Sequence, residues 1–142
     1  TGARWEEAES LGRSAIFGGK VHFHRTKNRQ SRSVPIPKEV EDLALKLGMP
    51  GNGRLFMSCR SAFRSAYERC GFRTPGQMTH ILRHTFASHY MMAGGDILGL
   101  QRILGHSSIA MTMRYAHLSP DHLESALRFS PLTQSRYAIS QT

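Results

Sequence analysis

The amino-acid sequence predicts an α+β fold that is mainly helical and carries one small three-stranded antiparallel sheet. Between residues 14 and 36, short apolar runs flank the Gly18-Gly19 pair, which is typical of a tight hairpin. From residue 37 to about residue 128, apolar residues recur at three- and four-residue spacing between turn signals, as in amphipathic helices. A length of 142 residues with 39% hydrophobic residues fits a single globular domain.

The first part of the chain is predicted to form one helix and then the sheet. Acidic residues near the start of residues 5–11 suit a helix N-terminus. Strands are expected at 14–17, 20–25 and 32–36, and Val21 and Phe23 alternate with His22 and His24 as in a half-buried strand. The polar run 26–30 is then an exposed turn. This arrangement gives a small sheet with a basic tip.

The rest of the chain is predicted to be helical. Helices are expected at 38–47, 60–70, 79–93, 97–104, 109–115 and 119–128, the first burying Val40, Leu43, Ala44 and Leu47. Asp96 is a candidate N-cap for the fourth of them. A break at residues 105–108 should let His106 and Tyr115 face one site. We assign residues 1–128 to the domain and residues 129–142 to a C-terminal tail.

Basic and acidic residues are segregated along a chain of net charge +9. No acid occurs from Lys20 to Lys38, which favours a polyanionic partner such as nucleic acid. No apolar run approaches the roughly 20 residues that a membrane span needs, and the N-terminus shows no signal peptide. We therefore expect an intracellular protein without membrane contacts. The basic residues in the acid-free stretch 20–38 are Lys20, Arg25, Lys27, Arg29, Arg32 and Lys38.

Metal-dependent chemistry is disfavoured by the scarcity of carboxylates. Beyond residue 69 the acids are Asp96, Asp121 and Glu124, too few and scattered for a two-metal nuclease site. His80 and His84 could share one face of a helix as metal ligands, but no carboxylate or cysteine accompanies them in sequence. We expect no metal, and instead an anion bound directly by cationic side chains.

Five separate motifs occur in order along the chain. They are Thr1-Gly2-Ala3-Arg4 with Glu7, Thr26-Lys27 with Arg32-Ser33-Val34-Pro35, His80-x-x-Arg83-His84-Thr85-Phe86, Leu104-Gly105-His106-Ser107-Ser108, and Tyr115-Ala116-His117. Together they resemble the catalytic domain of tyrosine recombinases, and within that family the temperate-phage integrases. The resemblance covers residues 1 to about 125 and implies that family's helical catalytic fold.

The resemblance implies a metal-free and cofactor-free transesterification on DNA. Tyr115 would attack a phosphodiester to give a 3′-phosphotyrosyl link. Arg4 and Arg83 would hold the non-bridging oxygens, to which guanidinium groups are matched. His106 would add a hydrogen bond to the phosphate. The alternatives to Tyr115 as nucleophile are Tyr67, Tyr90 and Tyr137, of which the first two lie in apolar helical segments and the third in the tail.

Supporting roles complete the implied site. His80 would orient the phosphate or assist proton transfer, Lys27 would protonate the leaving 5′ oxygen, and Glu7 would support Arg4 from behind. Taken singly, Arg4 could be a surface ion-pair partner of Glu7, and Lys27 a solvated turn residue. Basic residues of the hairpin are expected to bind DNA: Arg25, Arg29 and Arg32. The remaining histidines of the helical region are expected to be structural: His84, His89 and His117.

The implied partners are double-stranded DNA at recombination sites and other protomers in a synaptic tetramer. The implied location is the bacterial cytoplasm, at the nucleoid, with the protein encoded by a phage or another mobile element. Two alternative functions stay open. One is a type IB topoisomerase, which uses the same phosphotyrosyl step without exchanging strands. The other is a DNA-binding fragment that is inactive on its own.

Overall fold

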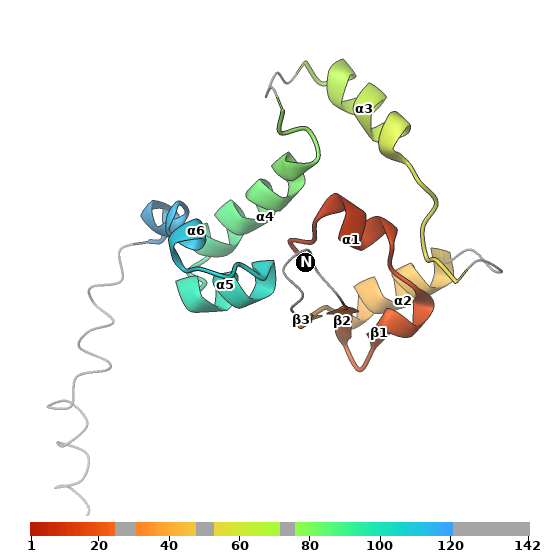
Figure 1. The fold of residues 1–142 in the computed structure, drawn as a ribbon, viewed down its shortest axis with the longest axis horizontal. Coiled ribbons are helices and arrows are strands. Elements are labelled where there is room, and N and C mark those ends of the chain that lie inside the picture. Colours follow the sequence, from red (N-terminus) through yellow and green to blue (C-terminus); the bar gives the residue numbers. More distant parts are fainter. Residues whose placement is uncertain (25–30, 48–52, 72–75, 121–142) are drawn as a thin grey trace, which may run out of the picture.

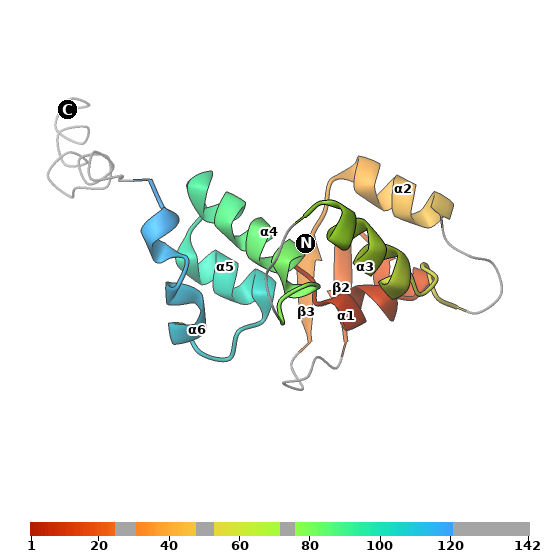
Figure 2. The same ribbon diagram turned by 90° about the horizontal axis from the view of Figure 1, so that it is seen from above.

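The structure is a computed structural model that describes residues 1–24, 31–47, 53–71 and 76–120. Figure 1 shows two parts, with a sheet, α1 and α2 on one side and α4, α5 and α6 on the other. The N-terminus lies between the two parts in both Figure 1 and Figure 2. Within the described ranges, no helix is long and apolar enough to span a membrane.

The sheet has three antiparallel strands, β1 (Ile16–Phe17), β2 (Lys20–Phe23) and β3 (Arg32–Pro35), in that order. Gly18 and Gly19 both have positive φ, 62° and 69°, as a two-residue hairpin turn of type I′ requires. The predicted sheet is therefore confirmed, with strands shorter than expected. A short 3-10 turn, η1 (Arg13–Ala15), takes up the start of the expected first strand.

The sheet buries one face against an apolar cluster. Val21 pairs with Val34 in register and both are buried. Two helices border this part, α1 (Trp5–Glu9) and α2 (Lys38–Leu47). The rest of the cluster is Leu11, Ala15, Ile16, Phe23, Ile36 and Leu55, with Ala44 and Leu45 of α2 packed against it.

The prediction of which α2 residues are buried is wrong for most of them. Val40, Leu43 and Leu47 are exposed, at 44%, 56% and 62%. Only Ala44 of the expected set packs on the core, together with Leu45. The helix is turned so that Glu41 is buried, while Val40, Leu43 and Leu47 face outward.

The second part is built from α4 (His80–Met92), α5 (Ile97–Leu104), α6 (Ala110–Met113) and a 3-10 turn, η2 (Ala116–Leu118). Asp96 caps α5 as predicted, since its carboxylate accepts from the Gly99 amide at 2.7 Å. Gly105 ends α5 in the left-handed region, with φ 65°. The core of this part consists of Ala87, Met91, Leu100, Leu104 and Tyr115.

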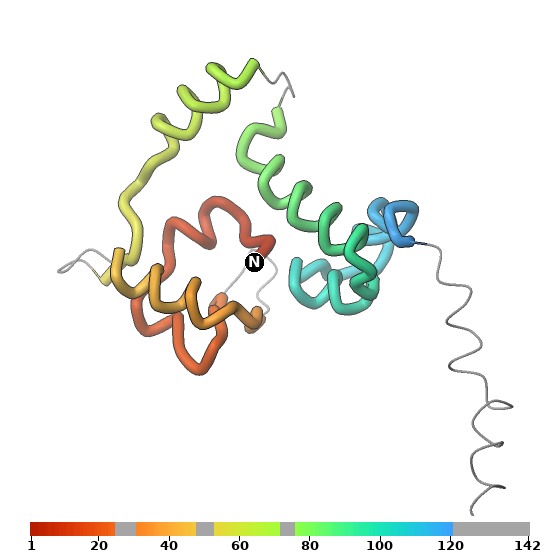
Figure 3. The backbone as a smooth tube through the Cα atoms, turned by 180° about the vertical axis from the view of Figure 1, so that it is seen from behind, coloured from red at the N-terminus to blue at the C-terminus, as the bar shows by residue number. Residues whose placement is uncertain are grey.

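The N-terminal residues join the two parts. A side chain at Gly2 would come within 2.8 Å of both Leu104 and Phe86, so only glycine fits between them. By contrast, α3 (Arg60–Arg69) lies at the edge of the molecule, as Figure 3 shows. Its aromatic contact with α1 is between Phe63 and Trp5, whose ring centroids are 4.9 Å apart.

Candidate active site

The two parts of the molecule bring cationic side chains together where they meet. Arg4 precedes α1, Arg83 lies on α4, and His106 follows the turn at the end of α5. Burial and then the charges of Arg4 and Arg32 lower the pKa of Arg83 to about 10. Burial and then Arg83 and Arg4, among other cations, lower the pKa of His106 to about 4. Arg4, Arg83 and His106 therefore lie within one electrostatic neighbourhood.

Arg83 is the fixed centre of this neighbourhood. Its side chain is buried, and its guanidinium donates to the Gly2 carbonyl and to the Leu104 carbonyl, both at 2.6 Å. These two bonds use part of the five-donor fork and neutralise none of its charge. The guanidinium is thus held from both parts of the molecule, with donors left for an anion.

Glu7 holds Arg4 in place and also binds Arg32, a contact that was not expected from the sequence. The carboxylate accepts from the Arg4 guanidinium at 2.9 Å and from the Arg4 backbone amide at 2.8 Å. Burial raises the pKa of Glu7, but hydrogen bonds and charge from Arg32 and Arg4 outweigh it and bring the value to about 2. Glu7 therefore stays ionised and fixes two guanidinium groups.

Arg32 is not at the surface that a DNA contact would require. It donates to both Glu7 oxygens, at 2.9 and 2.6 Å, and to the Ile103 carbonyl at 2.8 Å. Its guanidinium also lies 4.4 Å from the centroid of the Phe23 ring. Only 7% of its side chain is exposed. The physical reason is strand alternation, because Arg32 shares the inward face of β3 with Val34.

His106 is oriented by a buried threonine. Its Nδ1 lies 2.9 Å from the hydroxyl of Thr112, which is fully buried in α6. The low pKa makes the imidazole neutral at physiological pH. If the Thr112 hydroxyl donates to Nδ1, the ring carries its proton on Nε2 and can donate to an anion. Thr112 was not among the residues predicted from sequence.

Tyr115 reaches the site from the junction of α6 and η2 and touches a histidine that was expected to be structural. Its hydroxyl is 2.5 Å from Nδ1 of His84, and only 6% of the residue is exposed. Burial raises the pKa of Tyr115, partly offset by Arg114 and Arg83. Sequence reasoning missed both His84 and Arg114, although each is adjacent in sequence to a predicted site residue.

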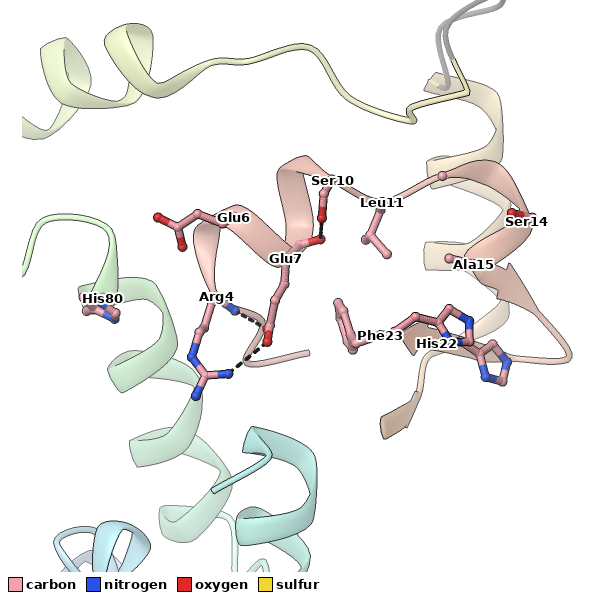
Figure 4. Close-up of a pocket in the computed structure, with 12 residues that line it drawn as sticks. Arg4, Glu6, Glu7, Ser10, Leu11, Ser14, Ala15, His22, Phe23 and His80 are labelled. Atoms are coloured by element: carbon pink, nitrogen blue, oxygen red, sulfur yellow. Dashed lines mark hydrogen bonds and ion pairs between the residues drawn. The ribbon is translucent and has the colours of Figure 1, made fainter. Parts of the chain in front are cut away.

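His80 lies at the rim of a cavity of about 690 Å³ beside the cationic cluster. Figure 4 shows His80 on α4, with Arg4 and Glu7 on the facing segment. His22 and His24 of the hairpin also line this cavity. The cavity is therefore bordered by the first helix, the hairpin and the start of α4.

Several predicted residues lie outside the described part of the chain. These include Lys27, the expected acid, and the expected tail from residue 129. Of the helix predicted at 119–128, all residues after 120 lie outside the described part. The hairpin arginines Arg25 and Arg29, which were expected to bind DNA, also lie outside it.

The described residues contain no group of three or more histidine, cysteine or acidic side chains that could hold a metal ion.

Comparison with known proteins matches this arrangement to one family. A family model described as the phage integrase family matches residues 1–122. A protein of Pseudomonas phage Pf1 is 78% identical over 141 residues, covering 99% of this chain and 42% of that protein. The integrase of Escherichia phage 186 is 57% identical over 133 residues, covering 93% and 39%. The chain thus spans about two fifths of the length of these curated relatives.

A solved structure matches the fold closely. The catalytic domain of the integrase of Haemophilus phage HP1 superposes with a TM-score of 0.84 at 51% identity. The match covers 94% of this chain and 77% of that one. The mainly helical fold with its three-stranded sheet, and the resemblance expected from the motifs, are therefore both confirmed.

Proposed function

This chain belongs to the phage integrase family, and we propose that it carries the catalytic site of a site-specific DNA recombinase. The proposed reaction cleaves and rejoins DNA through a 3′-phosphotyrosyl intermediate on Tyr115. Support for the chemistry comes from the cluster of guanidinium groups around Arg83, together with the position of Tyr115 beside it.

The proposal is supported most directly by a cationic centre whose positive charge is not fully neutralised by the protein. Arg4 and Arg32 share the carboxylate of Glu7, whereas the two bonds of Arg83 go to uncharged carbonyl oxygens. Buried positive charge is costly unless an anion compensates it. A phosphodiester fits this need, because guanidinium forks pair with its non-bridging oxygens in two-point geometry.

In the proposed first step the Tyr115 oxygen attacks phosphorus on the side opposite the 5′ oxygen. The Tyr115 O–H bond breaks and its proton passes to a neighbouring base, while an O–P bond forms and the P–O5′ bond breaks. Arg4, Arg83 and the Nε2–H of His106 stabilise the charge that builds on the non-bridging oxygens, as preorganised donors do in other enzymes. His80, at the rim of the cavity, orients the phosphate or assists proton transfer.

The leaving 5′ oxygen takes a proton from Lys27 in this scheme. In the second step another 5′-hydroxyl attacks the phosphotyrosine, the bond from phosphorus to Tyr115 breaks and the tyrosine is restored. One phosphodiester replaces another, so no nucleotide cofactor is needed to supply energy. Exchange of the attacking 5′ end is what turns cleavage into recombination.

The proposed partner is double-stranded DNA, with further protomers in a synaptic tetramer. Arg25 and Arg29 of the hairpin are proposed to meet the DNA backbone, and Arg32 to hold Glu7 instead. Because the relatives named above are phage proteins, we propose a phage or mobile-element origin and action at the nucleoid in the bacterial cytoplasm.

Covalent capture tests this function even though the target sequence is not specified in advance. The full chain is incubated with nicked DNA duplexes that contain a randomised central segment, and SDS-resistant protein–DNA adducts are recovered and sequenced. The recombinase proposal predicts adducts on an enriched sequence. DNA retention without any adduct would instead support a binding protein with an idle site.

A second assay separates recombination from topoisomerase action. Two plasmids that each carry the captured sequence are incubated with the protein and examined for joined products. A recombinase yields recombinant molecules. Relaxation of supercoils without recombinant products would show that the chain acts as a type IB topoisomerase.

A further inference from the structure

The hydroxyl of Tyr115 has a defined partner that the implied set of catalytic residues does not include. His84 lies on α4 directly after Arg83, and its Nδ1 is 2.5 Å from the Tyr115 oxygen. The two ring centroids are 5.9 Å apart at 44°, so the contact is through polar atoms at the ring edges and not through stacking. His84 thus touches the atom that would attack phosphorus.

Both groups of this hydrogen bond are neutral, and its direction depends on the tautomer of His84. Burial, and then the charges of Arg114, His80 and Arg83, lower the pKa of His84, so the imidazole is neutral and has one nitrogen lone pair. Burial raises the pKa of Tyr115, so the phenol keeps its proton. With the ring proton on Nε2, the phenol donates and Nδ1 of His84 accepts, and this is the tautomer that proton transfer from Tyr115 requires.

Other groups near the nucleophile are less suited to receive its proton. His80 lines the cavity and makes no hydrogen bond with Tyr115 within the described residues, so any help that it gives in proton transfer is at the phosphate. The charge of Arg114 acts on Tyr115 and lowers its pKa, but a guanidinium stays protonated and cannot act as a base. Nδ1 of His106 is already paired with Thr112. The charged groups that face His84 are Arg83 and Arg114, with His80 one turn earlier on the same helix.

We propose that His84 is a catalytic residue that aligns the Tyr115 hydroxyl and accepts its proton through Nδ1 as the tyrosine attacks the scissile phosphate. This inference rests on the proposed recombinase function. The Tyr115 O–H bond breaks, an N–H bond forms on His84 and the O–P bond forms. On rejoining, the same proton returns to the tyrosine oxygen.

The surrounding cations couple this proton transfer to DNA binding. An imidazolium at position 84 would add positive charge beside Arg83 and Arg114, which is unfavourable while the site is empty. A bound phosphodiester supplies a negative charge that compensates for it. His84 therefore accepts the proton readily only when DNA occupies the site, which keeps the unbound nucleophile in its neutral form.

The test uses the rate of adduct formation on the nicked sequence recovered by covalent capture. His84→Asn keeps an acceptor atom near the position of Nδ1 but cannot take a proton, whereas His84→Ala removes both. His89→Ala is the matched control, because His89 is an exposed histidine on the same helix. Thermal unfolding and DNA retention are measured for each variant.

We expect His84→Asn to slow adduct formation about a hundredfold or more, the usual contribution of a general base. His84→Ala should be at least as slow, while DNA retention and the His89→Ala rate stay near the wild-type values. A wild-type rate in a folded His84→Asn would overturn the inference.

A modified substrate distinguishes nucleophile activation from a general loss of structure. When sulfur replaces the bridging 5′ oxygen, the leaving thiolate needs no protonation, because thiols ionise near a pKa of about 8.5. This substrate should restore the rate of Lys27→Ala and leave His84→Asn slow. Restoration of His84→Asn would overturn the role of His84. Absence of an adduct with the wild-type protein would instead overturn the recombinase function on which it rests.

Discussion

Glu7 and Arg32 form a two-point ion pair, at 2.9 and 2.6 Å, between α1 and β3. The same carboxylate binds the side chain and the backbone amide of Arg4. The sheet is thereby tied to the residue that is proposed to hold the phosphate. Loss of the Glu7 charge should therefore affect both the stability of the fold and the geometry of the site.

Glu7→Gln should destabilise the fold and loosen Arg4. The amide keeps a similar shape but loses the charge that pairs two guanidinium groups, at a cost of about 2 kcal/mol in the free energy of unfolding. Urea denaturation of the variant and of wild type measures this difference. Glu6→Gln is the matched control, since Glu6 is 68% exposed on the same helix. Equal losses in the two variants would contradict the role of Glu7.

The stabilising effect of Glu7 should depend on pH in a predictable window. Its pKa is about 2 in the folded protein, lowered from 4.5, so the unfolded chain binds more protons between these values. The contribution is full above about pH 4.5 and is lost as pH falls toward about 2. The difference in unfolding free energy between wild type and Glu7→Gln should therefore shrink on acidification. A constant difference over that range would refute the pairing.

Thr112→Val should impair the chemistry with little change in packing. Valine fills nearly the same volume, but Nδ1 of His106 loses its partner, and the ring is no longer held in one tautomer. We expect a five- to tenfold slower adduct formation, about the worth of one hydrogen bond of ~1 kcal/mol. Thr85→Val, at an exposed position of α4, is the control. Unchanged kinetics for Thr112→Val would show that His106 is oriented by other contacts.

Arg83→Lys should lose most of its adduct formation although the positive charge is retained. A lysine ammonium is a single point and cannot bridge the Gly2 and Leu104 carbonyls while facing a phosphate, as the guanidinium fork can. Adduct formation should fall by about a hundredfold or more, as on loss of a preorganised donor. Arg102→Lys, at an exposed position of α5, should have no effect on the rate. Retained activity in Arg83→Lys would mean that charge alone suffices.

Most of the fold could be predicted because local signals agreed with it. Gly18-Gly19 fixed the hairpin, and Asp96 and Gly105 marked the ends of α5. The inward position of Arg32 was also foreseeable, since it alternates in phase with the buried Val34 on β3. Its charge suggested the surface instead, and its partner Glu7 lies 25 residues away in the chain.

The contacts that complete the site could not be derived from sequence pattern. His84 and Tyr115 are 31 residues apart and meet only because α4 packs beside the junction of α6 and η2. From the sequence, His84 was expected to be a structural histidine. The rotation of α2 likewise depends on tertiary contacts, because Ala44 and Leu45 pack on the cluster of the sheet while Val40, Leu43 and Leu47 are exposed.

The central claim is that Tyr115 is the nucleophile, and Tyr115→Phe tests it most directly on the captured nicked DNA. The substitution removes one hydroxyl from a buried ring, so folding and DNA retention should stay close to wild type. The account predicts that the SDS-resistant adduct disappears. An adduct at full yield from Tyr115→Phe would contradict it and move the covalent link to Tyr67, Tyr90 or Tyr137.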